Sequence, residues 1–257
     1  MLPIFFQHFW STCGEVVTST VLDFLNHGMS PPNFNETHIV LILKIKESKK
    51  VFDYRPISLC NVAYKIAFKA IANRLKKFLP SIISDTQSAF VHRRLIMNNV
   101  LVTFETMHHI SQKKGGRVGE MAIKLEMSKA YDRVEWVCME KIMEKLGFDV
   151  KWRKLIMQCI TIVSYAIRIN GYPRGRIIPS RGICQGDPLS LYLFLLCAEG
   201  LSALIKASVC NGIMEGIAIC HGGPKLSHLF FVDDSLIFCK ALLAECVSLQ
   251  RVLEVYE

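Results

Sequence analysis

Residues 229–238 read Leu229-Phe230-Phe231-Val232-Asp233-Asp234-Ser235-Leu236-Ile237-Phe238. Two apolar runs flank an adjacent pair of acids, and the bulky and β-branched residues on both sides favour strands. The acids fall where the chain should turn, which predicts a β-hairpin with two carboxylates at its tip. Asp is also a common turn residue because its side chain bonds nearby backbone amides, so the pair alone leaves a purely structural role open.

The composition indicates a folded protein with a polyanionic partner. The chain has 257 residues, of which 51% are hydrophobic, and a net charge of +9. This is enough for one large domain or two small ones with a sizeable core, and it argues against general disorder. The positive charge favours nucleic acid first and an anionic membrane surface second. A soluble basic protein without such a partner has the same balance.

The cysteines and the apolar segments indicate the redox environment of the protein and whether it spans a membrane. Ten cysteines are present, with no CxxC pair and no accompanying His cluster, so we expect a reducing compartment and no structural zinc. The first residues lack the basic region and cleavage site of a signal peptide. The most apolar run, 189–205, contains Glu199 and is short for a membrane span, which predicts a buried helix. We therefore expect reduced cysteines and no membrane partner.

The first part of the chain carries helical and strand-like patterns. Apolar residues at helical spacing end at Gly28, and strand-like runs over 37–43 and 53–59 flank a lysine-rich turn. Lys44 and Arg55, one on each arm, could hold a triphosphate, because Arg offers a planar fork and Lys a mobile point charge. A solvated charged turn explains the same pattern.

Two helices are predicted next. Residues 62–79 form an amphipathic pattern that Pro80 ends, and its basic face either follows a phosphate backbone or is simply solvated. A second helix is predicted over 98–110. The polar run 111–116 is the clearest internal boundary.

A strand carrying an acid at its end is predicted in the middle of the chain. Residues 121–127 alternate, with Met121 and Leu125 on one face and Glu126 on the other. Residues 132–135 then resemble a capping box, which makes Asp132 the predicted N-cap of a helix to Leu146. Tyr131 is either a core residue or the wall of a pocket.

A hairpin and a glycine-containing turn follow. Segments 164–169 and 176–179 predict a β-hairpin, and the turn 182–190 precedes a helix to about residue 207, with Asp187 as cap and Pro188 at the first helical position. Gln185 beside this turn could touch a nucleotide, although an ordinary glycine turn is the alternative. Strands and helices are mixed without internal repeats, so the predicted class is α+β.

The order of these features resembles the reverse transcriptases of non-LTR (LINE-type) retrotransposons, especially those common in plant genomes. The resemblance covers nearly the whole chain. It rests on five motifs in the family's order: Arg55-Pro56-Ile57-Ser58-Leu59, Ala72-Asn73-Arg74-Leu75, Gln87-Ser88-Ala89-Phe90, Lys124-Leu125-Glu126-Met127-Ser128-Lys129-Ala130-Tyr131-Asp132 and Gln185-Gly186-Asp187-Pro188-Leu189-Ser190.

The resemblance implies a right-hand polymerase fold and two-metal chemistry. Residues 1–30 would form a helical extension, 31–115 the fingers and 116–257 the palm. In the family, a primer 3′-hydroxyl attacks the α-phosphate of a deoxynucleoside triphosphate on an RNA template, with two Mg²⁺ ions (Mn²⁺ as a substitute) at the reacting oxygens. No obligate protein partner is implied. The family's habit of copying RNA at a chromosomal target implies an intracellular, nuclear location.

The resemblance also assigns roles by position. Asp233, Asp234 and the acid at position 126 would be metal ligands and catalytic residues. Lys44 and Arg55 would hold the incoming triphosphate. The nucleotide and template pocket would be lined by Tyr131, Gln185 and Gly186. Of these, Tyr131 would screen against a ribose 2′-hydroxyl.

At one position of the implied metal site, this chain differs from the family. The family has Asp where this chain has Glu126, whose side chain is one methylene longer. Mg²⁺ tolerates displaced ligands poorly, and a misplacement of about an ångström can lower a rate on the order of 10²-fold. We therefore expect weak or lost activity.

Further departures favour a degenerate copy. Leu43 and Leu191 stand where the family usually has Pro, and His92-Arg93 replace Pro-Gly. The chain ends at Glu257, just past the hairpin, so we expect neither a thumb nor a preceding endonuclease. The alternatives are a non-catalytic nucleic-acid-binding remnant and a relic reading frame without a stable product.

Overall fold

The computed structural model describes residues 3–113, 115–116, 118–220, 222–232 and 234–256. Helices and strands are mixed along the chain, which confirms the predicted α+β class. The chain forms two compact units, one made of Met1–Leu75 and Tyr131–Leu193, the other of Lys76–Ala130 and Phe194–Glu257. Each unit combines two separate stretches, so the units do not follow the boundaries at 30/31 and 115/116. The division into fingers and palm stays a prediction.

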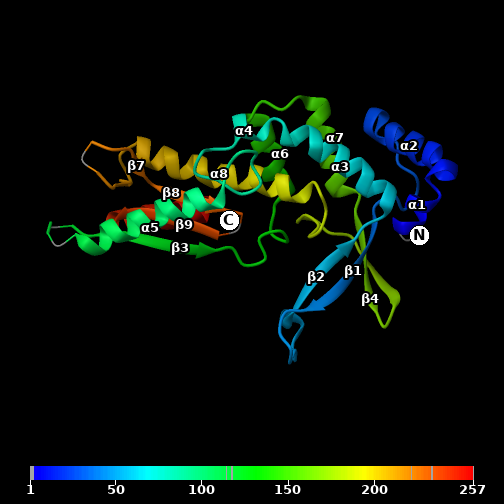
Figure 1. Cartoon of the computed structure of the whole chain (residues 1–257), viewed down its shortest axis with the longest axis horizontal. Helices are drawn as coiled ribbons and strands as arrows, with labels where there is room; N and C mark the ends of the chain where they lie inside the picture. Colours follow the sequence, from blue (N-terminus) through cyan, green and yellow to red (C-terminus); the bar gives the residue numbers. More distant parts are fainter. Residues whose placement is uncertain (1–2, 114, 117, 221, 233, 257) are drawn as a thin grey trace. The chain divides into compact units, whose positions relative to one another are not determined.

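The first unit contains a mixed sheet in the order β2-β1-β4-β5. β1 pairs with β2 in antiparallel fashion and with β4 in parallel fashion. β4 and β5 form a hairpin as predicted, but its second strand is Tyr172–Ile177 and not the predicted segment 176–179. Figure 1 shows β1 and β2 side by side, joined by the lysine-rich turn. The strands are β1 (Glu36–Leu43), β2 (Tyr54–Leu59), β4 (Ser164–Ile169) and β5 (Tyr172–Ile177).

Buried aromatic side chains form the core of this unit. The ring centroids of Phe24 and Phe34 lie 5.0 Å apart, and those of Tyr64 and Phe68 lie 3.6 Å apart. Large rings bury much apolar surface, so this cluster packs α2 and α3 against Phe34, which lies shortly before β1. The helical segments are α1 (Pro3–His8), α2 (Trp10–His27), η1 (Val51–Asp53), α3 (Val62–Lys76), α6 (Trp136–Lys145) and α7 (Val150–Thr161).

The second unit is built on a three-stranded antiparallel sheet in the order β3-β9-β8. β8 and β9 form the hairpin that residues 229–238 predict. A short pair, β6 and β7, precedes them. The strands are β3 (Glu120–Glu126), β6 (Ile217–Ala218), β7 (Lys225–Leu226), β8 (His228–Phe231) and β9 (Asp234–Lys240).

Two helices pack on one face of this sheet. Leu201 and Ile205 of α8 and Leu249 of α9 join Phe230 and Ile237 in one buried cluster. Met121 and Leu125 pack against the same cluster, so the predicted alternation of β3 is confirmed. The helices of this unit are α4 (Leu79–Ile82), α5 (Ile96–Gln112) and α9 (Leu243–Tyr256), together with all but the first turn of α8 (Ser190–Cys210).

Among the described residues, α8 is the helix that is long and apolar enough to cross a membrane by length and composition. The same properties suit the core helix of a folded domain. Because Leu201 and Ile205 are fully buried among residues of the second unit, the predicted buried helix is confirmed.

Three predicted helix ends are wrong, those at Asp132, Pro80 and Asp187. α6 begins at Trp136 with Glu135 at its N-cap, so Asp132 is not the N-cap. The reason is tertiary: the backbone of the preceding turn is engaged by another loop, with Gly182 N donating to Val134 O at 2.8 Å and Trp136 Nε1 donating to Gly182 O at 2.7 Å. Local capping patterns cannot anticipate such a contact.

The helix predicted over 62–79 is also divided. α3 ends at Lys76, and a second helix, α4, starts at Leu79 with Pro80 in its first turn. Proline lacks a backbone N–H, and the first turn of a helix needs no such donor, so Pro80 begins a helix here instead of ending one.

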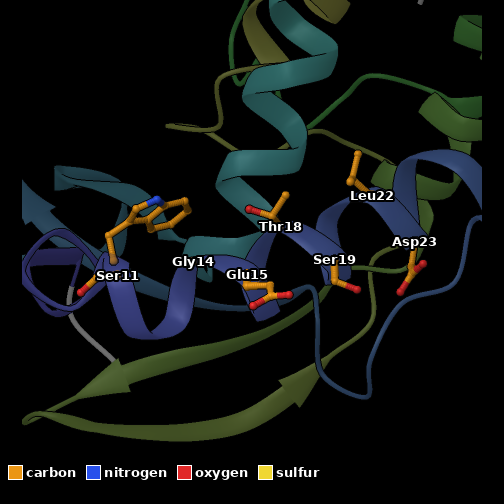
Figure 2. Close-up of a pocket in the computed structure, with 8 residues that line it drawn as sticks. Ser11, Gly14, Glu15, Thr18, Ser19, Leu22 and Asp23 are labelled. Carbon is orange, nitrogen blue, oxygen red and sulfur yellow. The ribbon is translucent and has the colours of Figure 1, made fainter.

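A hollow of ≈ 660 Å³ lies along α2. Figure 2 shows its lining side chains, among them Glu15 and Asp23, all of which come from this one helix. None of the predicted site residues lines it, so we assign it no part in the chemistry.

Candidate active site

The β8–β9 hairpin positions Asp234 at the start of its second strand. Phe231 and Asp234 are register partners, so the turn between the strands has two residues. Val232, the first of them, has a φ of 56°. Two-residue hairpin turns require positive φ, which a β-branched residue adopts only at a cost of about 1–3 kcal/mol. Asp233 lies outside the described residues, and its predicted role as a ligand stays a prediction.

The structure brings Glu126 and Asp234 together. Glu126 is the last residue of β3, and Asp234 is its register partner at the start of β9. Directly opposed residues in an antiparallel pair have Cβ atoms about 5 Å apart on the same face. Both residues are exposed, so two carboxylates predicted as ligands point from one face at the end of the sheet.

A lysine lies beside Asp234 at this end of the sheet. Lys124 Nζ lies 3.1 Å from Asp234 Oδ1, and the two side chains are 63% and 54% exposed. Lys124 is two residues from Glu126, so the strand period puts it on the same face. That period was visible in the sequence, but the diagonal ion pair depends on the register between β3 and β9, which only the structure supplies.

The donor set suits a hard divalent cation. Carboxylate oxygens are the ligands that Mg²⁺ and Mn²⁺ take in proteins, and Glu126 and Asp234 supply them from adjacent strands. No cluster of three or more His, Cys, Asp or Glu side chains that could hold a metal ion is found within the described part of the chain. The third predicted ligand, Asp233, is outside that part.

Lys44 and Arg55 lie on the two arms of the β1–β2 hairpin in the first unit. Arg55 pairs in register with Ile42, and Lys44 follows the last residue of β1. The Lys44 ammonium donates to the carbonyl of Phe52 at 3.1 Å, so it is oriented across the turn. The Asp53 carboxylate accepts from the backbone N–H of Lys50 at 2.8 Å, and such bonds lower the pKa of this exposed acid. The role of Lys44 and Arg55 in holding a triphosphate stays a prediction.

Gln185, Gly186 and Tyr131 lie on loops of the same unit. Ser58 N donates to Gln185 O at 3.1 Å, which ties the loop to β2. Gly186 has a φ of 94°, where a side chain would be strained. Ile183 N donates to Tyr131 O at 2.9 Å, so the Tyr131 turn runs beside this loop. The backbone contacts therefore link all three predicted pocket residues to one loop system, while their roles stay predictions.

Asp187 has a different place from the predicted one. α8 begins at Ser190, so Asp187 is not its N-cap and Pro188 is not its first residue. Asp187 Oδ1 instead accepts from Leu189 N at 2.7 Å in the turn before the helix. The residue is 6% exposed, and burial raises the pKa of its carboxyl to about 6, although the Leu189 hydrogen bond opposes the shift. The sequence marked this position as a cap but did not show that it would be buried.

Comparison with known proteins bears on this arrangement. Residues 45–257 match the family model described as reverse transcriptase (RNA-dependent DNA polymerase). The chain is 25% identical over 253 residues to the Xenopus laevis "Transposon TX1 uncharacterized 149 kDa protein", covering 98% of this chain and 18% of that protein. It is 24% identical over 243 residues to a Nasonia vitripennis "Retrovirus-related Pol polyprotein from type-1 retrotransposable element R2", covering 95% of this chain and 22% of the polyprotein.

The fold has a counterpart among solved structures. Apo telomerase from Candida tropicalis, truncated from its C-terminal domain, superposes with a TM-score of 0.57 at 14% identity. The match covers 88% of this chain and 47% of the telomerase chain, and it supports the fingers-and-palm polymerase fold. The chain spans about a fifth of the length of the two curated relatives above. The thumb and endonuclease expectations therefore stay untested.

Proposed function

Because the chain belongs to the reverse transcriptase family and is the reverse transcriptase domain of a LINE-type retrotransposon, we propose that it extends a DNA primer along an RNA template. The observation that carries the proposal is the register pairing of Glu126 with Asp234 at the end of the palm sheet. This pairing presents two carboxylates together on one exposed face, as nucleotidyl transfer requires.

Reverse transcriptases generally use divalent metal ions, and here we propose two Mg²⁺ ions held by Glu126, Asp234 and Asp233. When bound, such ions neutralise phosphate charge and lower the pKa of the attacking hydroxyl. The chain's own part is to hold the carboxylates, which repel one another, on adjacent strands that fix their spacing. Lys124 offsets part of that repulsion at Asp234.

The residues of the first unit would bind the incoming deoxynucleoside triphosphate. Lys44 and Arg55 supply cationic donors from the two arms of one hairpin, which suits phosphate oxygens. Tyr131 would screen the sugar 2′ position, and Gln185 and Gly186 would leave room for the base and template. We place the protein in the nucleus, where a chromosomal target would be copied.

A second candidate function follows from Glu126. The longer side chain moves its carboxylate outward by one methylene relative to the family's Asp, and octahedral Mg²⁺ sites do not tolerate such shifts well. A chain that binds nucleic acid through its basic surface without catalysing extension is therefore the alternative.

The test is primer extension on an RNA template with deoxynucleoside triphosphates and Mg²⁺. We expect weak extension by the wild-type protein because of Glu126, loss of that extension in Asp234→Asn and no change in Asp23→Asn, an exposed acid on α2. Extension that survives in Asp234→Asn would overturn the proposal. Binding of the template–primer without extension, by a protein shown to unfold cooperatively, would favour the second candidate.

A further inference from the structure

The backbone of Phe230, two residues before the strained Val232, is held by a segment from another part of the second unit. Phe230 N donates to Thr86 O at 2.8 Å, and Phe230 O accepts from Ser88 N at 3.3 Å. Asn99 Nδ2 of α5 donates to the same carbonyl at 3.1 Å. Residues 84–88, here called the clamp segment, therefore pair with the outer edge of β8, which would otherwise be the open edge of the sheet.

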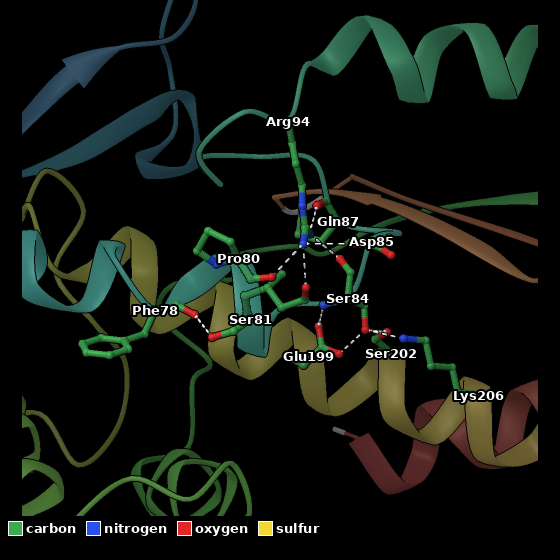
Figure 3. Close-up of polar contacts among 11 residues, drawn as sticks. Phe78, Pro80, Ser81, Ser84, Asp85, Gln87, Arg94, Glu199, Ser202 and Lys206 are labelled. Carbon is green, nitrogen blue, oxygen red and sulfur yellow. Dashed lines mark hydrogen bonds and ion pairs between the residues drawn. The ribbon is translucent and has the colours of Figure 1, made fainter.

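Arg94 holds the clamp segment in place. Its Nη1 donates to Ser84 O at 2.5 Å and to Gln87 O at 2.8 Å, and its Nη2 donates to Ile83 O at 2.8 Å. Figure 3 shows the Arg94 guanidinium with dashed lines toward the carbonyls of Ser84 and Gln87. The side chain is 17% exposed, and Asp85 is an outer partner at 3.3 Å. One planar fork thus joins three carbonyls of this loop, in addition to the turn bond from Gln87 N to Ser84 O at 3.1 Å.

A second set of contacts fixes the start of the clamp segment to α8. Ser84 N donates to Glu199 Oε2 at 2.9 Å, and the Ser84 hydroxyl also bonds the Glu199 carboxylate. Ser202 Oγ donates to the same hydroxyl at 3.1 Å, and Lys206 Nζ reaches it as well, as Figure 3 shows. The clamp segment is therefore anchored at both ends.

Strain at the turn supplies the reason for such an anchor. Val232 adopts a φ of 56°, and strained residues at functional sites persist only where the surrounding structure over-determines them. The three bonds to Phe230 fix the strand that enters this turn, and Asp234 is the first residue that leaves it. Loosening Phe230 would let the turn relax and move the Asp234 carboxylate away from Glu126.

We propose that Asn99 and Arg94 are positioning residues: through Phe230 and the clamp segment they hold the strained turn so that Asp234 faces Glu126. The inference rests on the proposed function, in that this hairpin is the metal-binding element. Neither residue touches the reacting atoms. Both act on the site from outside it, through the edge of the sheet.

The chain offers matched controls for both residues. Asn98 precedes Asn99 on α5 and is exposed, and Arg93 precedes Arg94 and is exposed. The test pairs are Asn99→Ala with Asn98→Ala, and Arg94→Lys with Arg93→Lys. Lysine keeps the charge but cannot span several carbonyls with one planar fork, so Arg94→Lys removes the geometry alone.

The first readout is amide hydrogen exchange over 228–236, with α9 as the internal reference for global stability. Loss of one hydrogen bond of this kind is worth about 1 kcal/mol or somewhat more, so we expect exchange of the hairpin to rise about tenfold in Asn99→Ala and Arg94→Lys. Exchange in α9 should change less, and the two control variants should match the wild type. Exchange that rises equally in α9 and the hairpin would overturn the proposal, as would no rise at all.

The second readout is Mn²⁺ affinity by paramagnetic resonance, with Asp234→Asn defining binding at the hairpin. Outer partners of metal ligands typically change affinity 10- to 100-fold, so we expect about tenfold weaker binding in both test variants. Faster hairpin exchange with unchanged Mn²⁺ affinity would reduce the two residues to a structural role and overturn the inference. Wild-type protein that binds no Mn²⁺ at Asp234 would overturn the inference and the metal part of the proposed function together. Failed primer extension with intact Mn²⁺ binding would contradict the proposed function and leave this inference unaffected.

Discussion

Glu126 and Asp234 are register partners in the antiparallel pair of β3 and β9, and Lys124 Nζ lies 3.1 Å from Asp234 Oδ1. Two acids and one cation therefore share one face at the end of the β3-β9-β8 sheet. In water, unit charges about 4 Å apart interact by about 1 kcal/mol, so each of these groups affects what the others can bind.

Shortening the acid on β3 should increase activity. Glu126→Asp moves the carboxylate back by one methylene, toward the position that the family's Asp would occupy. Because misplacement of about an ångström can cost on the order of 10²-fold in rate, we expect primer extension to rise by up to that factor. Asp234→Asn in the Glu126→Asp background is the control and should abolish the gain. Equal extension rates for the wild type and Glu126→Asp would contradict the prediction.

Removing the cation should strengthen metal binding. Lys124→Met deletes the positive charge beside Asp234, which competes with a divalent cation for the same carboxylate. The side chains are more than half exposed, so we expect about fivefold tighter Mn²⁺ binding at low ionic strength, from roughly 1 kcal/mol of Coulomb energy. High salt should diminish the effect. Lys129→Met, an exposed lysine on the following turn, serves as the comparison. Weaker Mn²⁺ binding in Lys124→Met would show that the lysine supports the site instead.

The Glu120 carboxylate should matter for stability. Its side chain is 3% exposed, and Oε1 accepts from Lys113 Nζ at 2.5 Å and Lys240 Nζ at 2.9 Å. Burial by itself raises the pKa of Glu120, but the hydrogen bonds from both lysines overcome this and hold it at about 2. We expect Glu120→Gln to lower the free energy of unfolding by about 2 kcal/mol at pH 7.

The contribution of Glu120 to the free energy of unfolding should decrease as the pH falls. A depressed carboxyl pKa stabilises the folded state above the ordinary value of 4.5, and this contribution is lost as the pH falls toward 2. Denaturant unfolding should therefore show the gap between wild type and Glu120→Gln closing over this window. Glu47→Gln, an exposed acid, should show no gap at any pH. A pH-independent gap would indicate a packing effect and not the ion pairs.

His228 should make the protein acid-sensitive in a higher pH window. The ring is fully buried, with Nε2 bonded to Ser202 Oγ at 2.9 Å and Nδ1 to Ser227 Oγ at 2.9 Å. Burial, with a smaller part from the Lys206 charge, lowers the pKa of His228 from 6.5 to about 4. The neutral ring is favoured in the folded state, so its contribution is present above pH 6.5 and is lost as the pH falls to about 4.

The expected loss is about 3 kcal/mol over that range, at 1.36 kcal/mol for each pKa unit. Unfolding midpoints at pH 7 and pH 4.5 should differ more for the wild type than for His228→Gln, which cannot titrate. His27→Gln, exposed at the end of α2, is the control. Equal pH dependence in the wild type and His228→Gln would refute the assignment.

Lys44 should affect nucleotide binding more than turnover. Its ammonium is oriented across the β1–β2 turn by the carbonyl of Phe52. A charge-assisted hydrogen bond to phosphate is worth about 1.5–3 kcal/mol, so Lys44→Ala should raise KM for deoxynucleoside triphosphates at least tenfold. Lys46→Ala, exposed in the same turn, should leave KM unchanged. Equal KM values for both variants would mean that the lysine-rich turn is a solvated surface.

Local sequence patterns determined the elements that carry the site. The alternation over 121–127, the two apolar runs around Asp233-Asp234 and the paired strands around the lysine-rich turn all formed as expected, because strand preference and turn chemistry are local properties. The positions of Glu126 and Asp234 at strand ends followed from the same patterns. The order of motifs along the chain was enough to indicate the family.

Only the tertiary structure decided what surrounds these elements. The register that pairs Glu126 with Asp234 and brings Lys124 to the same acid joins residues over a hundred positions apart in sequence. The start of α6 likewise depends on the distant loop at Gly182, and Asn99 bonds the backbone carbonyl of Phe230 on the edge of β8. The burial of Asp187 was not visible in its sequence neighbours either. Each buried polar group needs a partner, and the chain's fold, not its neighbours in sequence, determines which partner it finds.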